Sequence, residues 1–272
     1  MKKQLKAPFW IVLSLLVLFY ALPYVWMILN SFKTQNEIFQ AKILPDSFNL
    51  VNYIQVLGQG GFLKNIWNSF VVSSVSTLIC IAIGVPAAYA FARIKFRLKN
   101  TLFLLVLFIT IFPGVFIISP LYSFLSNIGA IDTHLALILP YVAYFSPLVV
   151  WILTSFFEAM PAPIEEMAIM DGANFVQMII RVLMPVALPG IITVAIIAFI
   201  MSWNEFMFAL VFTSSDAAKT VPVAIAHFQG INSLNWGEMT TAAVIATLPI
   251  VLGSIFLQKY VISGLTAGAV KE

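Results

Sequence analysis

The residues with the greatest chemical interest lie in two places, and the first is an acidic group inside an apolar stretch. Glu205 follows Trp203 and Asn204 within the stretch 190–213. A carboxylate at membrane depth costs about 2.5–3.5 kcal/mol on insertion scales, so its side chain should face protein or water rather than lipid. We expect Trp203, Asn204 and Glu205 to line a path for a polar solute and to offer it hydrogen bonds. The alternative is that Glu205 lies near the outer interface and is solvated by water.

The second place is the polar segment 158–189, which carries the signals of a short helix between two breaks. Pro163 suits the first turn of a helix, because its missing N–H would have no partner there. Glu165 and Glu166 then fall where the helix dipole favours acidic side chains. Gly172 suits the end of the helix. The pattern therefore predicts a short helix over about 163–173.

This short helix has an apolar edge, and a second short helix follows it. Ile164, Met167 and Ala168 share one face at i, i+3, i+4 spacing, so we expect an edge that is free to dock. Asn174 can cap the next helix, over 175–184. The alternative is an interfacial helix that lies on the lipid surface.

The sequence offers little for catalysis or metal binding. His134 and His227 fall outside the apolar stretches, and the single cysteine, Cys80, has no partner for a disulfide or a C-x-x-C site. The phosphate-binding pattern G-x-x-x-x-G-K-[ST] does not occur, so ATP cannot be hydrolysed on this chain by that route. We expect no catalytic residue and no metal site.

Composition indicates that a bilayer is the solvent of this chain. Of 272 residues, 61% are hydrophobic and 9% are charged, and the mean hydropathy is +1.01. A soluble domain carries about 25% charged residues. Six apolar stretches are each long enough for a spanning helix of about 20 residues. The sequence therefore predicts an all-α polytopic membrane protein, with spans at 9–31, 67–92, 101–126, 135–157, 190–213 and 240–262.

Prolines in or near these spans favour a bundle with an irregular interior. Each interior proline removes a backbone hydrogen bond and kinks its helix, which membrane proteins tolerate where neighbours or a water-filled cavity satisfy the freed carbonyl. The prolines are Pro23, Pro86, Pro113, Pro120, Pro140, Pro147 and Pro249.

The distribution of Lys and Arg predicts the orientation, because cytoplasmic loops are enriched in both. Six spans place both termini on one side, together with the very short loop at 93–99 and the segment 158–189. That side carries Lys2, Lys3, Lys6, Arg93, Lys95, Arg97, Lys99, Arg181, Lys259 and Lys271, whereas the other carries Lys33, Lys42, Lys64 and Lys219. We therefore expect cytoplasmic termini and outer loops at 33–65, 127–134 and 214–239. The first apolar stretch is too long for a signal peptide, so we expect an uncleaved span.

The segment 158–189 resembles the EAA loop of ABC importer permeases, whose pattern is E-A-A, three residues, G, nine residues, I-x-L-P. Glu166-Met167-Ala168, Gly172 and Val182-Leu183-Met184-Pro185 keep this spacing. Met167, Val182 and Met184 depart from the pattern, each by one apolar residue for another. Asp171-Gly172-Ala173 also matches the form common in sugar importers.

Other segments of the second half resemble the second permease subunit of maltose- and trehalose-type importers. They are Trp203-Asn204-Glu205-Phe206, Pro222-Val223-Ala224 and the tail from Gly264 to Lys271. The resemblance divides the chain into a first span with its outer loop, 1–65, and an importer transmembrane domain, 66–272, that contains the coupling loop 158–189.

The resemblance implies the architecture of a type I ABC importer permease. A homologous second permease, two ATP-binding subunits that carry ATP and Mg, and an extracytoplasmic solute-binding protein would complete the transporter. The substrate would be a maltose- or trehalose-like sugar or oligosaccharide, moved inward by alternating access, with no cofactor on this chain and no nucleic-acid partner. The resemblance places ATPase coupling on Ile164, Glu165, Glu166, Met167, Ala168, Asp171, Gly172 and Ala173.

Two other classes of function stay open at this point. An ion-coupled secondary transporter of a polar solute would need ionisable groups within its spans, and Glu205 is the one that qualifies. An intramembrane enzyme would need a catalytic or metal-binding cluster in a span.

Overall fold

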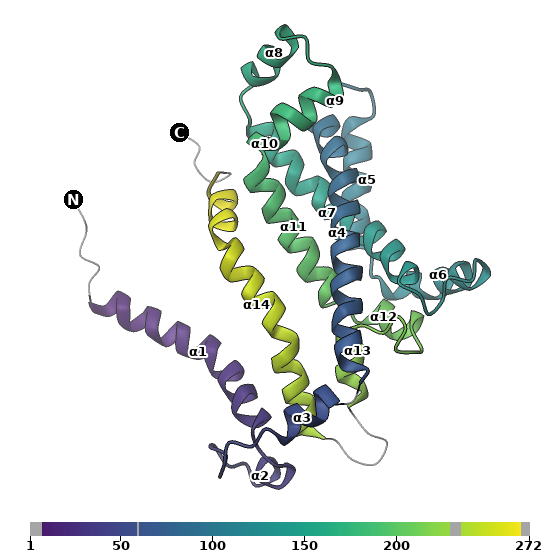
Figure 1. Ribbon diagram of the computed structural model, residues 1–272. Coiled ribbons are helices and arrows are strands. Elements are labelled where there is room, and N and C mark those ends of the chain that lie inside the picture. The colour runs from purple at the N-terminus through teal and green to yellow at the C-terminus, as the bar shows by residue number, and fades with distance from the viewer. Residues whose placement is uncertain (1–6, 59, 229–234, 268–272) are drawn as a thin grey trace. The chain divides into compact units, whose positions relative to one another are not determined.

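The computed structural model describes residues 7–58, 60–228 and 235–267, and its regular structure there is helical (Figure 1). The N-terminal lysines, Gln59, residues 229–234 of the predicted outer loop and the tail after Ala267 lie outside the described residues. The helices are α1 (Ala7–Ser31), α2 (Gln35–Phe39), α3 (Val51–Gly58), α4 (Phe62–Arg93), α5 (Lys99–Ile111), α6 (Val115–Asn127), α7 (Leu135–Ala159), α8 (Pro163–Met170), α9 (Phe175–Gln177), a π-helical turn (Met178–Leu183), α10 (Met184–Val186), α11 (Leu188–Trp203), α12 (Met207–Phe212), α13 (Val221–His227) and α14 (Trp236–Ala267).

Four helices are long and apolar enough to cross a membrane, namely α1, α4, α7 and α14. They confirm four of the predicted spans. Two further pairs of helices qualify when each bent pair is counted as one span, which gives up to six. Pro23, Pro86, Pro140, Pro147 and Pro249 lie inside these long helices.

The third predicted span, 101–126, is bent rather than straight. α5 ends at Ile111 and α6 begins at Val115, and the two helices differ in direction by 95°. Pro113 lies between them and cannot donate a backbone hydrogen bond to continue α5. The next residue, Gly114, occupies the N-cap of α6. The proline pattern indicated a kink here but not the size of the bend.

The fifth predicted span, 190–213, is also broken. α11 ends at Trp203, and α12 begins at Met207 after three residues. At its other end, α11 makes an angle of 82° with the helical segment Phe175–Val186. Pro189 occupies the first turn of α11, where a proline is tolerated because the first N–H groups of a helix have no intrahelical partner.

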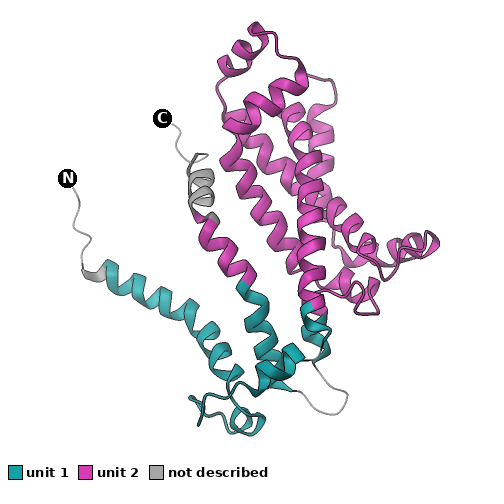
Figure 2. Cartoon of the chain, viewed as in Figure 1, with its two compact units in different colours: residues 1–63, 224–248 teal, residues 64–223, 249–272 magenta. Residues whose placement is uncertain are grey.

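The chain forms two compact units (Figure 2). Unit 1 comprises residues 1–63 and 224–248, and unit 2 comprises residues 64–223 and 249–272. The division of the chain near residue 65 that the family resemblance implies stays a prediction.

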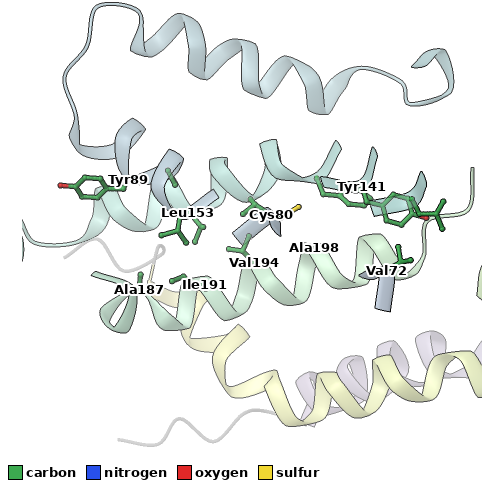
Figure 3. Close-up of a cluster of buried hydrophobic side chains, with 14 of the residues drawn as sticks. Val72, Cys80, Tyr89, Tyr141, Leu153, Ala187, Ile191, Val194 and Ala198 are labelled. Atoms are coloured by element: carbon green, nitrogen blue, oxygen red, sulfur yellow. The ribbon is translucent and has the colours of Figure 1, made fainter. Parts of the chain in front are cut away.

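Unit 2 contains a core built from α4, α7 and α11 (Figure 3). Small residues let these helices approach closely, as in other membrane bundles. A Cβ added at Gly84 of α4 would lie 2.6 Å from Cγ1 of Val149 on α7. A Cβ added at Gly190 of α11 would lie 2.7 Å from the ring of Phe156, also on α7. The two glycines therefore fix how closely α4 and α11 pack on α7.

In unit 1, the apolar surface of α1 is exposed, and its most apolar window is 0% buried. In a bilayer such a surface contacts lipid or another protein surface. Just after α1, Lys33 is 1% exposed, and its Nζ donates to Oδ1 of Asn30 at 2.7 Å and to the carbonyl of Lys42 at 2.6 Å. Burial lowers the pKa of Lys33 below its usual value, against the opposing effect of Glu37.

Candidate functional site

The EAA-like helix α8 is seated on the core of unit 2 by one face and exposes the other. Ala168 is 5% exposed, and Ile164 packs against the core cluster. Met167, Ile169 and Met170 are 58%, 63% and 86% exposed. The structure thus places Ile164 and Ala168 inward, where the chain's own core holds them, and not on a free edge as expected.

The outward surface of α8, which we call the docking face, consists of Glu166, Met167, Ile169 and Met170. Glu166 and Met170 are four residues apart, so one turn of helix brings an acidic group next to an exposed thioether. An exposed apolar cluster of this kind, with a charge beside it, is typical of a contact surface for another protein.

The end of α8 is fixed by a backbone motif around Gly172. The φ angle of Gly172 is +79°. This value lies in the left-handed region that residues with a side chain rarely adopt. It lets Ala173 N–H donate to the carbonyl of Ala168 and Gly172 N–H donate to that of Ile169, both at 3.0 Å. The pair of bonds is a Schellman motif, with Asp171 as the C-cap, so the helix ends where the sequence predicts.

The next helix begins directly after this corner, at a capping box. Asn174 accepts a hydrogen bond from Gln177 N–H at 2.9 Å, and Gln177 accepts one from Asn174 N–H at 3.0 Å. The predicted cap is therefore confirmed. The predicted helix 175–184 is a composite of α9, a π-helical turn and α10, which ends at Val186. The corner between α8 and α9 has its backbone amides in hydrogen bonds at both ends.

Glu165, the residue beside Glu166, points inward. Its Oε1 lies 2.6 Å from Nε of Arg93, the last residue of α4. Its Oε2 accepts a hydrogen bond from the hydroxyl of Tyr89 at 3.2 Å. The two adjacent acids of α8 therefore have different surroundings, one in an internal ion pair and one on the exposed surface.

Sequence reasoning used Arg93 for orientation alone and did not single out Tyr89. Both residues lie on α4 and are four positions apart, so they share a helix face. That spacing is visible in the sequence. Their partner Glu165 is 72 residues after Arg93, and no local pattern connects the two.

Glu205 occupies the break between α11 and α12 and serves backbone groups there. Its carboxylate accepts hydrogen bonds from Phe208 N–H at 2.9 Å and from Ala209 N–H at 3.2 Å. The hydroxyl of Tyr141, on α7, donates to Oε2 at 2.7 Å. The carboxylate thus supplies partners to N–H groups in the first turn of α12, which would otherwise lack them. These contacts explain how an acid is accommodated within a span.

Trp203 and Asn204 lie on either side of the end of α11. The Trp203 side chain is 3% exposed and stacks on Phe199 at 5.8 Å between ring centroids. Asn204 is exposed, and its amide donates to the carbonyl of Ile200 at 2.9 Å. The structure therefore gathers Trp203, Asn204 and Glu205 at one break. The residues to which the family resemblance assigns ATPase coupling lie on α8 and on the three residues that follow it.

A cavity of about 510 Å³ lies within unit 2, among residues of α4, α11 and the second half of α14. Its lining includes the hydroxyls of Ser74, Thr77 and Ser254 and is otherwise mainly apolar. Oγ1 of Thr77 is buried without a hydrogen-bond partner. Trp203, Asn204 and Glu205 are not among its lining residues.

Asp132 connects the loop before α7 to the loop after α12. It accepts hydrogen bonds from the N–H groups of Ser214 and Ser215, at 2.9 and 3.0 Å, and from the Ser215 hydroxyl at 2.6 Å. Partial burial acts to raise the pKa of Asp132, but the hydrogen bonds from Ser215 and Ser214 outweigh it and lower the pKa. Within the described parts of the chain, His, Cys, Asp and Glu form no group of three that could hold a metal ion.

Comparison with known proteins identifies relatives that match almost the whole chain. The chain is 37% identical over 264 residues to the trehalose/maltose transport system permease protein MalG of Thermococcus litoralis, covering 96% of this chain and 94% of that protein. It is also 37% identical over 269 residues to the trehalose transport system permease protein SugB of Mycobacterium tuberculosis, covering 98% of each chain. A third relative, the sulfoquinovosyl glycerol transport system permease protein SmoH of Agrobacterium fabrum, is 34% identical and covers 92% of this chain and 88% of its own.

A solved structure has the same fold. A chain of a bacterial ABC transporter involved in the import of the acidic polysaccharide alginate superposes with a TM-score of 0.78 at 20% identity, covering 92% of this chain and 94% of its own. The fold is that of an ABC importer permease, as the sequence resemblance predicts.

The model of the family described as "Binding-protein-dependent transport system inner membrane component" matches residues 80–266, which include α8 and the breaks at Gly172 and Glu205. The EAA-like helix α8 and the nearly full-length alignments to permeases agree with this family. The chain is a membrane-embedded protein of the binding-protein-dependent transport system inner membrane component family.

Proposed function

We propose that this chain is a membrane-spanning permease subunit of an ATP-driven sugar importer, for a maltose- or trehalose-like sugar or oligosaccharide. The observation that carries the proposal is the 37% identity to two trehalose-transporting permeases over nearly the full length of each. A relative that transports another glycoside, sulfoquinovosyl glycerol, supports a carbohydrate substrate.

The proposed assembly has four kinds of subunit. This permease pairs with a homologous second permease, and two ATP-binding subunits supply ATP and Mg²⁺ chemistry. An extracytoplasmic solute-binding protein delivers the sugar. The structure of an alginate transporter in complex with a pentasaccharide-bound periplasmic protein, which superposes with a TM-score of 0.66, supports this last partner.

In the proposed mechanism, α8 is the coupling helix that contacts one ATP-binding subunit from the cytoplasm. Its docking face supplies the contact, and Ile164 and Ala168 carry movement into the core that they touch. Asp171, Gly172 and Ala173 hold the corner at the end of the helix. The sequence has no phosphate-binding loop of its own, so the energy of ATP hydrolysis enters through this contact.

The proposed sugar path passes the break at Trp203, Asn204 and Glu205. Asn204 is exposed and retains the carbonyl oxygen of its amide for hydrogen bonding. Glu205 shapes the break through its bonds to α12, and the buried Trp203 stacks on Phe199. Both termini are proposed to be cytoplasmic, because six spans place them on the side of the basic loop 93–99, and cytoplasmic loops are enriched in Lys and Arg.

The test is purification of the full chain in mild detergent from its native membrane, with identification of the proteins that remain bound. We expect a second permease and an ATP-binding subunit. The purified complex in liposomes, given its binding protein, should take up trehalose or maltose only when ATP is present on the side of α8. Uptake driven by an ion gradient without ATP would contradict the proposal and support a secondary transporter.

A further inference from the structure

Arg93 joins three helix ends. It is the last residue of α4, and its Nε lies 2.6 Å from Oε1 of Glu165 in the first turn of α8. Its Nη2 donates to the carbonyl of Met160, the C-cap residue of α7, at 2.5 Å. A single guanidinium therefore connects α4, α7 and α8.

Tyr89 adds a second connection from the same face of α4. Its hydroxyl donates to Oε2 of Glu165 at 3.2 Å, so both oxygens of that carboxylate are bonded to α4. Its ring lies 6.1 Å from that of Phe157 on α7 and 5.6 Å from that of Phe175 on α9. The packing around Glu165 is thus continuous with the packing of both helices that flank α8.

The ion pair between Arg93 and Glu165 is favoured by the helix dipoles and by its partial burial. The C-terminus of α4 carries the negative end of its dipole and the N-terminus of α8 the positive end, so Arg93 and Glu165 are each favoured where they lie. Their side chains are 21% and 15% exposed. Partial exclusion of water strengthens a charge pair. The planar guanidinium serves two acceptors at once, which a lysine cannot do with the same geometry.

Neighbouring charges show that this arrangement is specific to one pair. Lys95 and Arg97, in the same short loop, are exposed, as is Glu166 beside Glu165. The other ion pairs found among the described residues, Lys42 with Asp46 and Lys219 with Asp216, each lie within one local segment. The Arg93–Glu165 pair is therefore the ion pair of unit 2 that joins two distant helices.

We infer that Arg93 is a positioning residue of the coupling mechanism, which through Glu165 makes α4 move together with α8. The inference rests on the proposed function, because it assumes that an ATP-binding subunit displaces α8. It adds a defined role for Glu165 that differs from contact with that subunit. The carboxylate of Glu165 faces the chain's own α4, whereas Glu166 lies on the docking face.

The experiment measures sugar uptake per ATP hydrolysed in the reconstituted complete transporter, for Arg93→Gln, Glu165→Gln and the double variant. We expect each single variant to lower this ratio about tenfold, and the double variant to lower it no further, because the two residues act as one unit. Arg93→Lys should give an intermediate ratio. Arg97→Gln, which removes the same charge from an exposed residue, should leave the ratio unchanged.

Two further measurements separate the explanations. Co-purification of the ATP-binding subunit should be unchanged in every variant, since none alters the docking face. An unchanged uptake ratio in Arg93→Gln would overturn the inference and leave the proposed function intact. The inference would equally be overturned if uptake and ATP hydrolysis fell in proportion to a loss of thermal stability. If the native chain itself binds no ATP-binding subunit, the proposed function fails.

Discussion

Three carboxylates of this protein, Glu37, Asp132 and Glu205, each accept hydrogen bonds from two backbone N–H groups. In each case the acid stabilises a turn or the start of a helix, where N–H groups lack partners within the local structure. These three acids bond to backbone N–H groups, whereas Glu165 bonds to the side chains of Tyr89 and Arg93. The type of partner therefore helps to predict what a substitution will change.

Gly172 is the residue where a substitution should act through the backbone alone. A Cβ there would meet no atom within 4 Å, and the φ is +79°. A left-handed backbone costs about 1–2 kcal/mol for residues with a side chain. We expect Gly172→Asn to impair uptake less than Gly172→Ala, and Gly172→Val most. The chain should remain in the membrane in all three.

Gly58→Ala is the matched control for these variants, because Gly58 has open space around it and no positive φ. Uptake by this control should equal that of the native chain. Equal uptake by the control and all three Gly172 variants would contradict the assigned role of the corner.

Glu166→Lys should abolish uptake, because it reverses the charge on the docking face. Insertion in the membrane should be unchanged, since the Glu166 side chain is exposed. Uptake and co-purified ATP-binding subunit are the measurements. A variant that still couples ATP hydrolysis to transport would remove Glu166 from the coupling site.

Glu205 and Asn204 should respond differently to substitution. Glu205→Ala leaves two N–H groups of α12 without partners. Each should cost about 1–3 kcal/mol of stability. Tyr141→Phe, which removes one donor to Glu205, should cost less.

Asn204→Ala should change the affinity or range of sugars with little effect on stability. The measurements are thermal unfolding in detergent and uptake of a panel of sugars. An unaltered sugar range in both the Asn204 and Glu205 variants would remove these residues from the proposed path.

The loop after α1 should become less stable in acid because of Glu37. Hydrogen bonds from Asp46 N–H and from the side chain and N–H of Thr34 lower the pKa of Glu37 from 4.5 to about 2. Because the folded pKa lies below the unfolded one, this contribution to stability is fully present above pH 4.5. It is lost as the pH falls from 4.5 toward 2. Hydrogen exchange at the Asp46 amide should report this loss, and Glu37→Gln should remove its pH dependence.

The sequence alone predicts the start or end of a helix where the residues that fix it are close together in the chain. Pro163 at the start of α8, Gly172 at its end and the cap at Asn174 were all predicted from residues within one or two turns. The size of the bend at Pro113 was not, because it depends on packing against other helices. Arg93 lies 72 residues from Glu165 and Tyr141 lies 64 residues from Glu205, so only folding brings these pairs together.

The close contact between α4 and α7 should tolerate little added volume. Gly84→Ala places a Cβ 2.6 Å from Cγ1 of Val149. One helix must then shift, at a cost of about 1–3 kcal/mol. Val149→Ala in the same chain should restore most of the lost stability by removing that methyl group. Thermal unfolding of the single and double variants in detergent measures both effects. A Gly84→Ala variant as stable as the native chain would show that α4 and α7 can separate freely.

For the molecule as a whole, composition and charge sufficed to predict a helical membrane protein, and the two bent pairs account for the difference between four straight spans and six. Within unit 1 the apolar surface of α1 is unburied, so it needs lipid or another protein surface as a neighbour. These properties agree with the family description, which is that of one component of a transport system.

Orientation can be tested with thiol labelling, since the lone cysteine, Cys80, is 1% exposed and should not react in the folded chain. Ala217→Cys and Arg97→Cys introduce thiols at exposed positions in loops that are predicted to face opposite sides. In intact cells, a membrane-impermeant reagent should label residue 217 at once and residue 97 only after permeabilisation. The opposite result would invert the proposed orientation, and labelling of both in intact cells would contradict an odd number of spans between residues 97 and 217.

The corner between α8 and α9 restrains how α8 can move. Its amides are committed to the Schellman bonds at Gly172 and the capping box at Asn174, which makes it stiff rather than compliant. A displacement of α8 is therefore passed on to α9 with little deformation of the corner between them. In the proposed transporter, thermodynamic linkage makes the coupling reciprocal: the factor by which nucleotide on the ATP-binding subunit changes the sugar affinity of the permease is the factor by which sugar changes the nucleotide affinity.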